Sequence, residues 1–274
     1  MKISNDQISI KIDPHGAELK SIMKDNIEYL WQGDSTYWKR TSPLLFPVVG
    51  RLLDDEFKYN GKYYKMAQHG LARDMAFELV SSCRFGATYA LQYNKSTLEQ
   101  YPFKFRLTVN YVILDSTVTI NWMVENIDMK PIYFSIGAHP AFNFKNGSIF
   151  EINKKTTQYD LNSTPYIHSS KKVEINEILV DDSTFMNDAI ILSDIDSILL
   201  KDDMKAIEVK CFEFPYMGLW SKVQNGKNAP FICIEPWYGL ADFVNHNKAI
   251  IDKKGIKKLN VGGIFKATYK IALK

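Results

Sequence analysis

Apolar and polar residues alternate along much of the chain, which is the pattern of β-strands that bury one face. The clearest alternation runs over residues 103–113, turns at Asp115 and Ser116, and returns over residues 118–124. The interleaved residues are largely Lys, Arg, Thr and Asn, as expected for a sheet with one wetter face. We therefore predict a long antiparallel hairpin in this part of the chain.

Shorter segments show the same alternation and are also predicted to be strands. Asn60 and Gly61 favour a type I′ turn inside a hairpin over residues 57–64, because both residues readily adopt a positive φ. The polar segment 96–100 predicts one helical turn, and residues 216–220 predict an aromatic-glycine turn. The other predicted strands cover residues 8–12, 17–22, 87–93, 198–200, 207–209, 231–234 and 265–273.

Residues 154–183 lack this alternation, so we predict mostly loop there, with short strands at most. The chain shows no long helical period, internal repeat or glycine-serine linker. Many strands joined by short turns predict an all-β fold, an antiparallel sandwich or barrel with little helix. The simplest organisation is a single domain over residues 1–274.

Composition and charge narrow the functional classes. Of the 274 residues, 46% are hydrophobic, which is enough for a continuous core. A formal net charge of +3 gives no reason to expect nucleic acid or an acidic membrane surface as a partner. The densest basic run, Lys253 and Lys254 followed by Lys257 and Lys258, is interpreted as a solvated loop.

Three features predict a soluble cytoplasmic protein. The cysteines Cys83, Cys211 and Cys233 are odd in number, far apart and without Cys/His metal spacing, so we expect reduced thiols. The first residues lack the apolar core of a signal peptide. No apolar run is long enough to cross a bilayer.

His139 is the first candidate for chemistry. It follows Gly137 and Ala138 and precedes Pro140, which pushes the histidine toward extended geometry at the end of a strand. A strand end can direct an imidazole into a cleft, and histidine most easily exchanges a proton near neutral pH. From this segment alone, a structural histidine is the simpler interpretation.

Glu235 repeats this arrangement, because it ends an apolar strand directly before Pro236. Alternation along the strand directs Phe231, Cys233 and Glu235 to one face. A buried glutamate needs a partner. The structural alternative is a salt bridge to Arg51 or Arg73.

Other segments carry polar or aromatic residues that strand packing does not require. Arg51 is a lone cation in an apolar run and must snorkel, pair or face a polar cavity. His69 and Arg73 lie close together after a predicted strand. Trp220 and Trp237, with Tyr238, are aromatic residues suited to stacking against a flat apolar face.

Together these segments resemble the aldose 1-epimerases, or galactose mutarotase-like proteins, nearly from end to end. The matching motifs are Gly16-Ala17-Glu18-Leu19, Tyr29-Leu30-Trp31, Phe46-Pro47-Val48-Val49-Gly50-Arg51, His69-Gly70-Leu71-Ala72-Arg73, Gly137-Ala138-His139-Pro140-Ala141-Phe142 and Glu235-Pro236-Trp237. The resemblance implies a large antiparallel β-sandwich (a supersandwich) with a sugar-binding cleft on its concave face.

The resemblance also implies roles for individual residues. His139 resembles the proton donor to the sugar ring oxygen, and Glu235 the base that removes the C1 hydroxyl proton. Arg51 and His69 resemble residues that bind and polarise the sugar. Arg73 belongs to a motif of branches distant from the galactose-specific enzymes.

Two departures argue against galactose specificity. Residues Leu52 to Asp55 stand where galactose mutarotases have an asparagine. The sugar-binding aspartate of galactose mutarotases also has no match in this chain, since residues 214–220 occupy the corresponding part of the sequence. The acid–base pair is unaffected. The cations Lys39, Arg40, Arg51 and Arg73 are numerous enough to accommodate a sugar phosphate.

The resulting hypothesis is an aldose 1-epimerase that interconverts α and β anomers of a free or phosphorylated aldose without metal or other cofactor. Its expected partner is a small sugar, and its expected state is a monomer or homodimer. The first alternative is a non-catalytic sugar-binding or sensing protein of the same fold. The second is a metal-dependent enzyme with His69, His139 and Glu235 as ligands.

Overall fold

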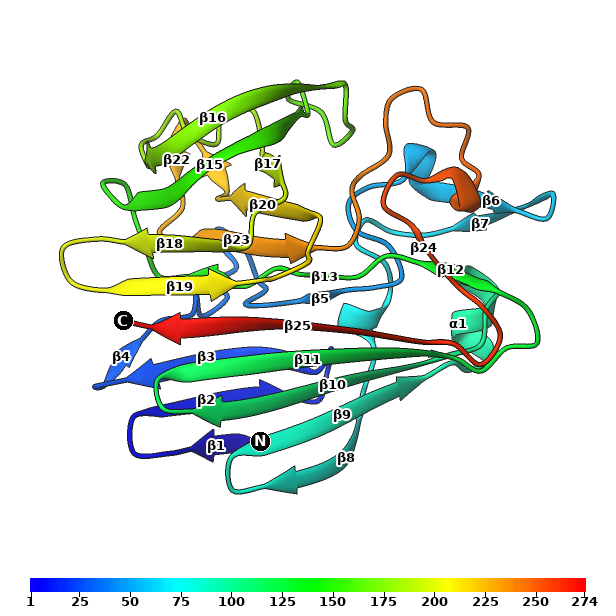
Figure 1. Ribbon diagram of the computed structural model, residues 1–274, viewed down its shortest axis with the longest axis horizontal. Coiled ribbons are helices and arrows are strands. Elements are labelled where there is room, and N and C mark those ends of the chain that lie inside the picture. The colour runs from blue at the N-terminus through cyan, green and yellow to red at the C-terminus, as the bar shows by residue number, and fades with distance from the viewer.

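The protein is built almost entirely of antiparallel strands (Figure 1). The computed structural model describes all residues from Met1 to Lys274. Every ladder between named strands is antiparallel. The predicted antiparallel β-sandwich with little helix is confirmed. No helix combines the length and apolar character needed to cross a membrane.

A large sheet of 15 strands forms most of the molecule. The catalytic candidates lie near one end of its path, where short strands from distant parts of the sequence meet. In spatial order its strands are β5 (Leu44–Leu45), β13 (Gly137–Ala138), β23 (Ile232–Trp237), β20 (Tyr216–Trp220), β17 (Ile190–Ser193), β15 (Ile149–Asp160), β18 (Ser197–Lys201), β19 (Ala206–Lys210), β25 (Ile264–Leu273), β11 (Thr117–Asn126), β10 (Phe105–Leu114), β9 (Gly86–Gln92) and β8 (Glu78–Cys83), with β14 (Ala141–Phe142) paired to β23 and β16 (Ser169–Leu179) paired to β15.

A second sheet of four strands accompanies it. Its strands are β1 (Lys2–Ser4), β2 (Ile8–Asp13), β3 (Glu18–Lys24) and β4 (Ile27–Glu28). Three hairpins or strand pairs complete the β structure: β6 (Glu56–Tyr59) with β7 (Lys62–Lys65), β12 (Ile132–Phe134) with β24 (Lys257–Leu259), and β21 (Val223–Gln224) with β22 (Lys227–Asn228). The helical elements are α1 (Lys95–Gln100) and the 3₁₀ turns η1 (Leu53–Asp55), η2 (Ala72–Asp74) and η3 (Ile250–Asp252).

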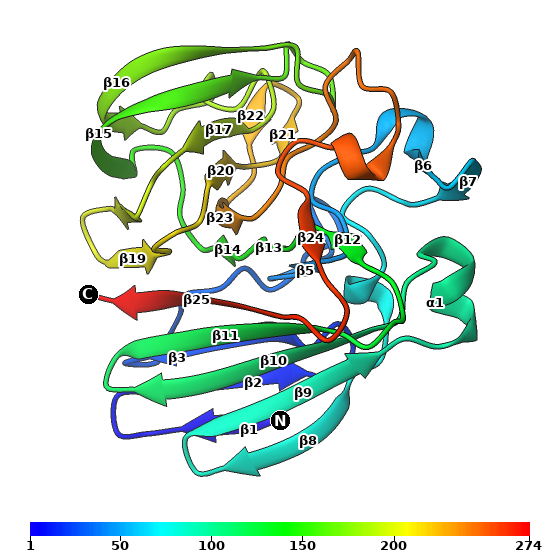
Figure 2. The ribbon, with the colours of Figure 1, turned by 45° about the vertical axis from the view of Figure 1, so that its right-hand side comes forward.

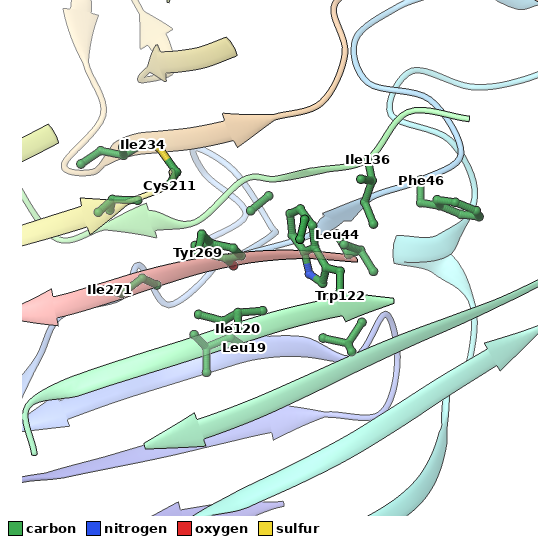
Figure 3. Packing of buried hydrophobic residues seen from close by; sticks show 14 of the residues in the cluster. Leu19, Leu44, Phe46, Ile120, Trp122, Ile136, Cys211, Ile234, Tyr269 and Ile271 are labelled. Atoms are coloured by element: carbon green, nitrogen blue, oxygen red, sulfur yellow. The ribbon is translucent and has the colours of Figure 1, made fainter. Parts of the chain in front are cut away.

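The two sheets share one hydrophobic core. Figure 3 shows Leu19 of β3, Ile120 of β11 and Tyr269 of β25 within the same cluster of 60 buried residues. The alternating burial of β10 and β11 supplies this core from one face while the other face stays partly exposed. Because one cluster joins both sheets, we propose that residues 1–274 form a single domain.

Most of the predicted strands and turns are present. The long hairpin is β10 and β11, with Asp115 at a φ of 50° in its turn. Asn60 and Gly61 connect β6 to β7 with φ values of 47° and 78°. The predicted helical turn is α1, which the Asn94 side chain caps by accepting from the Thr97 N–H.

The prediction of loop over residues 154–183 is wrong. This region contains most of β15 and all of β16, a long hairpin at the top of both ribbon views (Figures 1 and 2). Neither face of β16 is deeply buried, so polar residues are tolerated at both sets of alternating positions. The alternation on which the prediction depends is therefore missing, although backbone pairing to β15 holds the strand.

Two smaller predictions are also wrong. Residues 216–220 form strand β20, in the interior of the large sheet, instead of a turn. Gly218 in this strand faces the indole of Trp237, and a Cβ atom added there would lie 2.6 Å from Cη2. Lys253 does not belong to a solvated loop, because it is buried and forms an ion pair with Asp242.

Candidate active site

A cavity of about 520 Å³ lies over β17, β20 and β23, which are neighbours in the large sheet (Figure 2). This volume is in the range of sites for small molecules. All seven residues proposed from the sequence for catalysis or binding line it: Arg51, His69, Arg73, His139, Trp220, Glu235 and Trp237. The structure therefore brings together residues from five separate segments of the chain.

His139 and Glu235 are positioned by strands that pair directly. His139 lies in the link between β13 and β14, and both of these strands pair with β23. Glu235 lies in β23 itself, opposite Gly218 of β20. His139 Nε2 is 3.1 Å from Glu235 Oε2, and both residues are buried.

Several buried polar atoms around the cavity have no hydrogen-bond partner in the protein. Glu235 Oε2 is among them, since its close approach to His139 Nε2 lacks the alignment of a hydrogen bond, and His139 Nδ1 is another. Arg73 Nε and Trp237 Nε1 are also unpartnered. Buried polar groups are usually satisfied, so this concentration at one cavity points to a polar ligand.

Burial sets the protonation of the pair. It lowers the pKa of His139 to about 3, and the charge of Arg73 acts in the same direction. Burial also raises the pKa of the Glu235 carboxyl well above its ordinary value, with a further contribution from Asp188. In the empty cavity, burial therefore keeps the imidazole neutral at pH 7 and favours the uncharged form of the carboxyl.

His69 is held as a neutral hydrogen-bond donor. Burial and the nearby His139 keep its pKa well below the ordinary value. Its Nδ1 accepts from the Gly50 N–H at 3.2 Å, which places the proton of a neutral ring on Nε2. The Gln68 amide lies 3.3 Å from Nε2 and can accept that proton when its oxygen is turned toward the ring. Gly70 makes this turn feasible, because a Cβ atom there would lie 2.3 Å from the carbonyl oxygen of Phe46.

The two arginines differ in their charge partners. Arg51 forms a bidentate ion pair with Asp55, at 2.9 and 2.7 Å. Arg73 donates to the Gln68 carbonyl oxygen at 2.6 Å and lies 3.8 Å from Asp74. Burial and the neighbouring Arg40 lower the pKa of Arg73 to about 10. Neither arginine pairs with Glu235, so the predicted structural salt bridge is not formed.

Aromatic rings surround His139. Trp38 stacks on its imidazole with ring centroids 4.8 Å apart, and Trp220 meets it edge to face at 5.6 Å. Trp237 is more deeply buried and packs on Gly137 and Gly218. These rings fix the imidazole plane and give the cavity a flat apolar wall.

The sequence analysis missed several residues of the cavity. Trp38 follows Tyr37 in a polar segment without periodicity, so an aromatic pair in a loop was the only signal. Asp188 is the other carboxylate of the cavity, and it precedes β17, between the loop predicted over residues 154–183 and the strand predicted over residues 198–200. Gln68 and Lys222 also line the cavity.

The proposed metal set of His69, His139 and Glu235 does not form in the structure. The side chains whose ligand atoms all lie within 4.8 Å of one another are His139, Cys233 and Glu235. Cys233 replaces His69 because alternation along β23 places it on the same face as Glu235.

Comparisons with known proteins agree with this architecture. The family model described as aldose 1-epimerase matches residues 1–251. The chain is 28% identical to the plasmid-encoded protein LacX of Lactococcus lactis subsp. lactis, over 100% of this chain and 99% of LacX.

Two crystal structures are similar over the whole chain. The galactose mutarotase related enzyme from Lactobacillus acidophilus has a TM-score of 0.96 and 30% identity, covering 100% of this chain and 97% of that one. The galactose mutarotase-like protein from Lactobacillus casei has a TM-score of 0.94 and 28% identity, covering 100% and 99%.

Proposed function

This chain belongs to the aldose 1-epimerase family, and we propose that it interconverts the α and β anomers of an aldose through His139 and Glu235. One observation carries the proposal. A buried imidazole and a buried carboxyl lie 3.1 Å apart in a cavity of suitable size for a sugar, and Glu235 Oε2 has no hydrogen-bond partner.

In the proposed reaction, ionised Glu235 removes the proton of the C1 hydroxyl while protonated His139 gives a proton to the ring oxygen. The bond between C1 and the ring oxygen breaks, and the sugar opens to the aldehyde. Rotation about C1–C2 and reclosure deliver the other anomer. Closure returns a proton from Glu235 to the aldehyde oxygen and one from the new ring oxygen to His139, so both groups are regenerated.

The reactive form differs from the resting form only in where one proton lies. Burial in the empty cavity favours that proton on Glu235, whereas the reaction uses it on His139. A bound sugar favours the transfer, because its C1 hydroxyl can donate to the ionised carboxylate and its ring oxygen can accept from the imidazolium. The Glu235 carboxyl, which lines the cavity, is the group that would receive the hydroxyl proton.

We expect kcat/KM to show no acid limb at the ordinary imidazole value, and to fall on the alkaline side only above the ordinary carboxyl range. Activity requires one proton on the pair, whichever atom holds it at rest. The second proton binds only in strong acid, because the pKa of His139 is lowered to about 3, and the last proton leaves above the ordinary carboxyl range, because the pKa of Glu235 is raised. Anomer exchange measured by polarimetry across pH tests this, after subtraction of the uncatalysed rate. An acid limb centred near pH 6.5, the ordinary imidazole value, would contradict it.

The cavity suggests a substrate class as well as a reaction. Asp188 is the acidic residue that we propose for binding sugar hydroxyls. Arg73 and Lys222 are available for an anionic group, since Arg51 is already neutralised by Asp55. We therefore propose that phosphorylated aldoses are accepted beside free ones, with Arg73 as the main phosphate ligand.

Arg73→Gln tests this substrate class. A charged hydrogen bond contributes roughly 1.5–3 kcal/mol, so KM for a phosphorylated aldose should rise by about 10–150-fold. KM for the corresponding free aldose should change much less. Lys39→Gln is the matched control, because Lys39 is exposed and does not line the cavity. An equal change in KM for both sugars would assign Arg73 a structural role instead.

The decisive test of the reaction is anomer exchange followed by NMR with a panel of free and phosphorylated aldoses. The proposal expects one or more sugars to exchange anomers faster with protein than without it. Saturable sugar binding with no acceleration for any sugar would favour the non-catalytic binding protein.

A further inference from the structure

Cys233 is the buried reactive group that the proposed reaction leaves unused. It precedes Glu235 by two positions in β23, so both side chains emerge on the same face of the sheet. Its neighbours Ala141 of β14 and Trp220 of β20 hold the strand on either side. The thiol therefore lies directly beside the acid–base pair.

Three different metal ligands meet at this point. The imidazole of His139, the thiol of Cys233 and the carboxyl of Glu235 offer ligand atoms that all lie within 4.8 Å of one another, and all three residues are buried. Imidazole, thiolate and carboxylate are the ligand types of zinc sites, and a site with three protein ligands keeps a fourth position open. The cavity lies on the open side, since it is lined by His139 and Glu235.

We propose that His139, Cys233 and Glu235 bind a thiophilic divalent cation, Zn²⁺ or Cd²⁺, and that the bound cation blocks anomer exchange. The inhibitory part rests on the proposed function, whereas the binding site itself does not. A cation here occupies the imidazole nitrogen and carboxylate oxygen that must exchange protons with the sugar.

The separations suit this assignment. Two nitrogen or oxygen ligands at about 2.0–2.1 Å from a tetrahedral Zn²⁺ lie roughly 3.3 Å apart, and His139 Nε2 and Glu235 Oε2 are 3.1 Å apart. With a Zn–S bond of about 2.3 Å, the sulfur would lie roughly 3.6 Å from the other two ligand atoms, so it needs to approach by at most about 1.2 Å.

The charges also balance. A bound divalent cation displaces the thiol proton and the carboxyl proton, because thiolate and carboxylate are the forms that bind metal. One thiolate and one carboxylate then neutralise the cation, and the imidazole remains uncharged. The cation also gives Glu235 Oε2 the partner that it lacks in the protein. A neutral, fully coordinated unit is the arrangement that a buried site favours.

Titration with Cd²⁺ alone tests the site without reference to activity. The parent protein carries Cys83→Ser, which removes the exposed thiol. We expect a thiolate-to-Cd²⁺ charge-transfer band in the ultraviolet that saturates at one Cd²⁺ per chain. Cys233→Ala should abolish the band, and Glu235→Gln should weaken Cd²⁺ binding by at least about 10–100-fold, the loss caused by removing even an outer-shell partner.

Cys211→Ala is the matched control, since Cys211 is equally buried but donates to the Ile195 carbonyl oxygen elsewhere in the core. Its band should equal that of the parent. Inhibition by Cd²⁺ is expressed as a fraction of each variant's own anomer-exchange rate after chelator treatment. The Cd²⁺ concentration for half-inhibition should rise at least tenfold in Cys233→Ala.

A charge-transfer band that persists in Cys233→Ala would overturn the site. So would a band that saturates at the same Cd²⁺ concentration in Glu235→Gln as in the parent. Since Glu235→Gln leaves the thiol in place, this second criterion holds even if the cysteine variant does not fold. If the parent protein is inactive after chelator treatment, the proposed function is refuted. The Cd²⁺ band would still show whether the metal site exists. Cd²⁺ bound at Cys233 without inhibition would overturn the blocking role.

Discussion

Glu235→Gln should lower kcat by about 10²–10⁴-fold, the range for loss of a general base, while sugar affinity changes little. Glutamine keeps the shape of the side chain and can still hydrogen-bond a hydroxyl, but it cannot take up the C1 hydroxyl proton. Anomer-exchange rates and sugar titrations on the same protein measure the two effects separately. His139→Asn, which removes the other half of the pair, should give a comparable loss.

The stability of Glu235→Gln should move in the opposite direction from its activity. A folded-state pKa above the unfolded value means that the contribution of Glu235 to stability is present below about pH 4.3 and is lost as pH rises through the folded pKa. The neutral glutamine avoids that loss, so its melting temperature should equal or exceed that of the parent at neutral and alkaline pH.

Glu99→Gln is the matched control for both measurements, because Glu99 is exposed on α1. It should change neither the rate nor the melting temperature. A well-folded Glu235→Gln protein that exchanges anomers at the parental rate would end the assignment of Glu235 as the base. A large loss of melting temperature without loss of rate would make Glu235 a structural residue.

Lys253→Met should lower the free energy of unfolding by about 3–5 kcal/mol, the cost of leaving a buried charge without its partner. Lys253 Nζ donates to Asp242 Oδ1 at 2.8 Å, and both side chains are almost fully buried. Asp242 Oδ2 accepts from the Leu53 N–H at 3.0 Å, and the Asp242 N–H donates to the Arg51 carbonyl oxygen. The pair thus anchors the loop that carries Arg51 into the cavity. Urea denaturation measures the loss.

The neighbouring Lys254 supplies the control, because it is exposed. Lys254→Met should change the free energy of unfolding by less than about 0.5 kcal/mol. The double variant with Lys253→Met and Asp242→Asn should recover part of the loss, since no unpaired charge remains. Equal effects of the two single lysine variants would show that the buried pair contributes nothing.

Acid should reduce the contribution of this pair. Burial alone would raise the pKa of Asp242, but the hydrogen bond with His246 and the charge of Lys253 together lower it to about 2. A folded-state pKa below the unfolded value gives stability that is present above about pH 3.9 and is lost as pH falls through about 2. The difference between the parent and Lys253→Met should therefore shrink over that interval.

Alternation in the sequence predicts the strands that bury only one face. It does not identify strands whose two faces are equally buried or equally exposed. β10 and β11 alternate cleanly between buried and partly buried positions, so their pattern identifies them. β16 has no fully buried position on either face, and β20 is buried at four of its five positions, so neither alternates between buried and exposed positions. Backbone pairing holds such strands, and pairing partners are not encoded in periodicity.

Part of the candidate active site could likewise be predicted from local sequence, and part could not. His139 and Glu235 could be found because each follows an apolar segment and directly precedes a proline, which is a local signal, although β23 continues through Pro236 to Trp237 instead of ending at Glu235. The approach of His139 to Cys233 and Glu235 depends on β13 and β14 pairing with β23, and the sequence alone does not fix that register. The burial of Lys253 could not be predicted for the same reason. Its buried partner Asp242 is 11 residues away, and the local sequence does not indicate the contact.

The position of β25 in the large sheet has a consequence for folding during synthesis. β25 pairs with β11 on one side and with β19 on the other (Figure 1), so the sheet lacks an interior strand until residues 264–273 have left the ribosome. Until then β11 and β19 present two open edges that can pair with other chains. We expect the nascent protein to depend on chaperones at this stage, and its slow step to be the late insertion of β25 between strands made long before it.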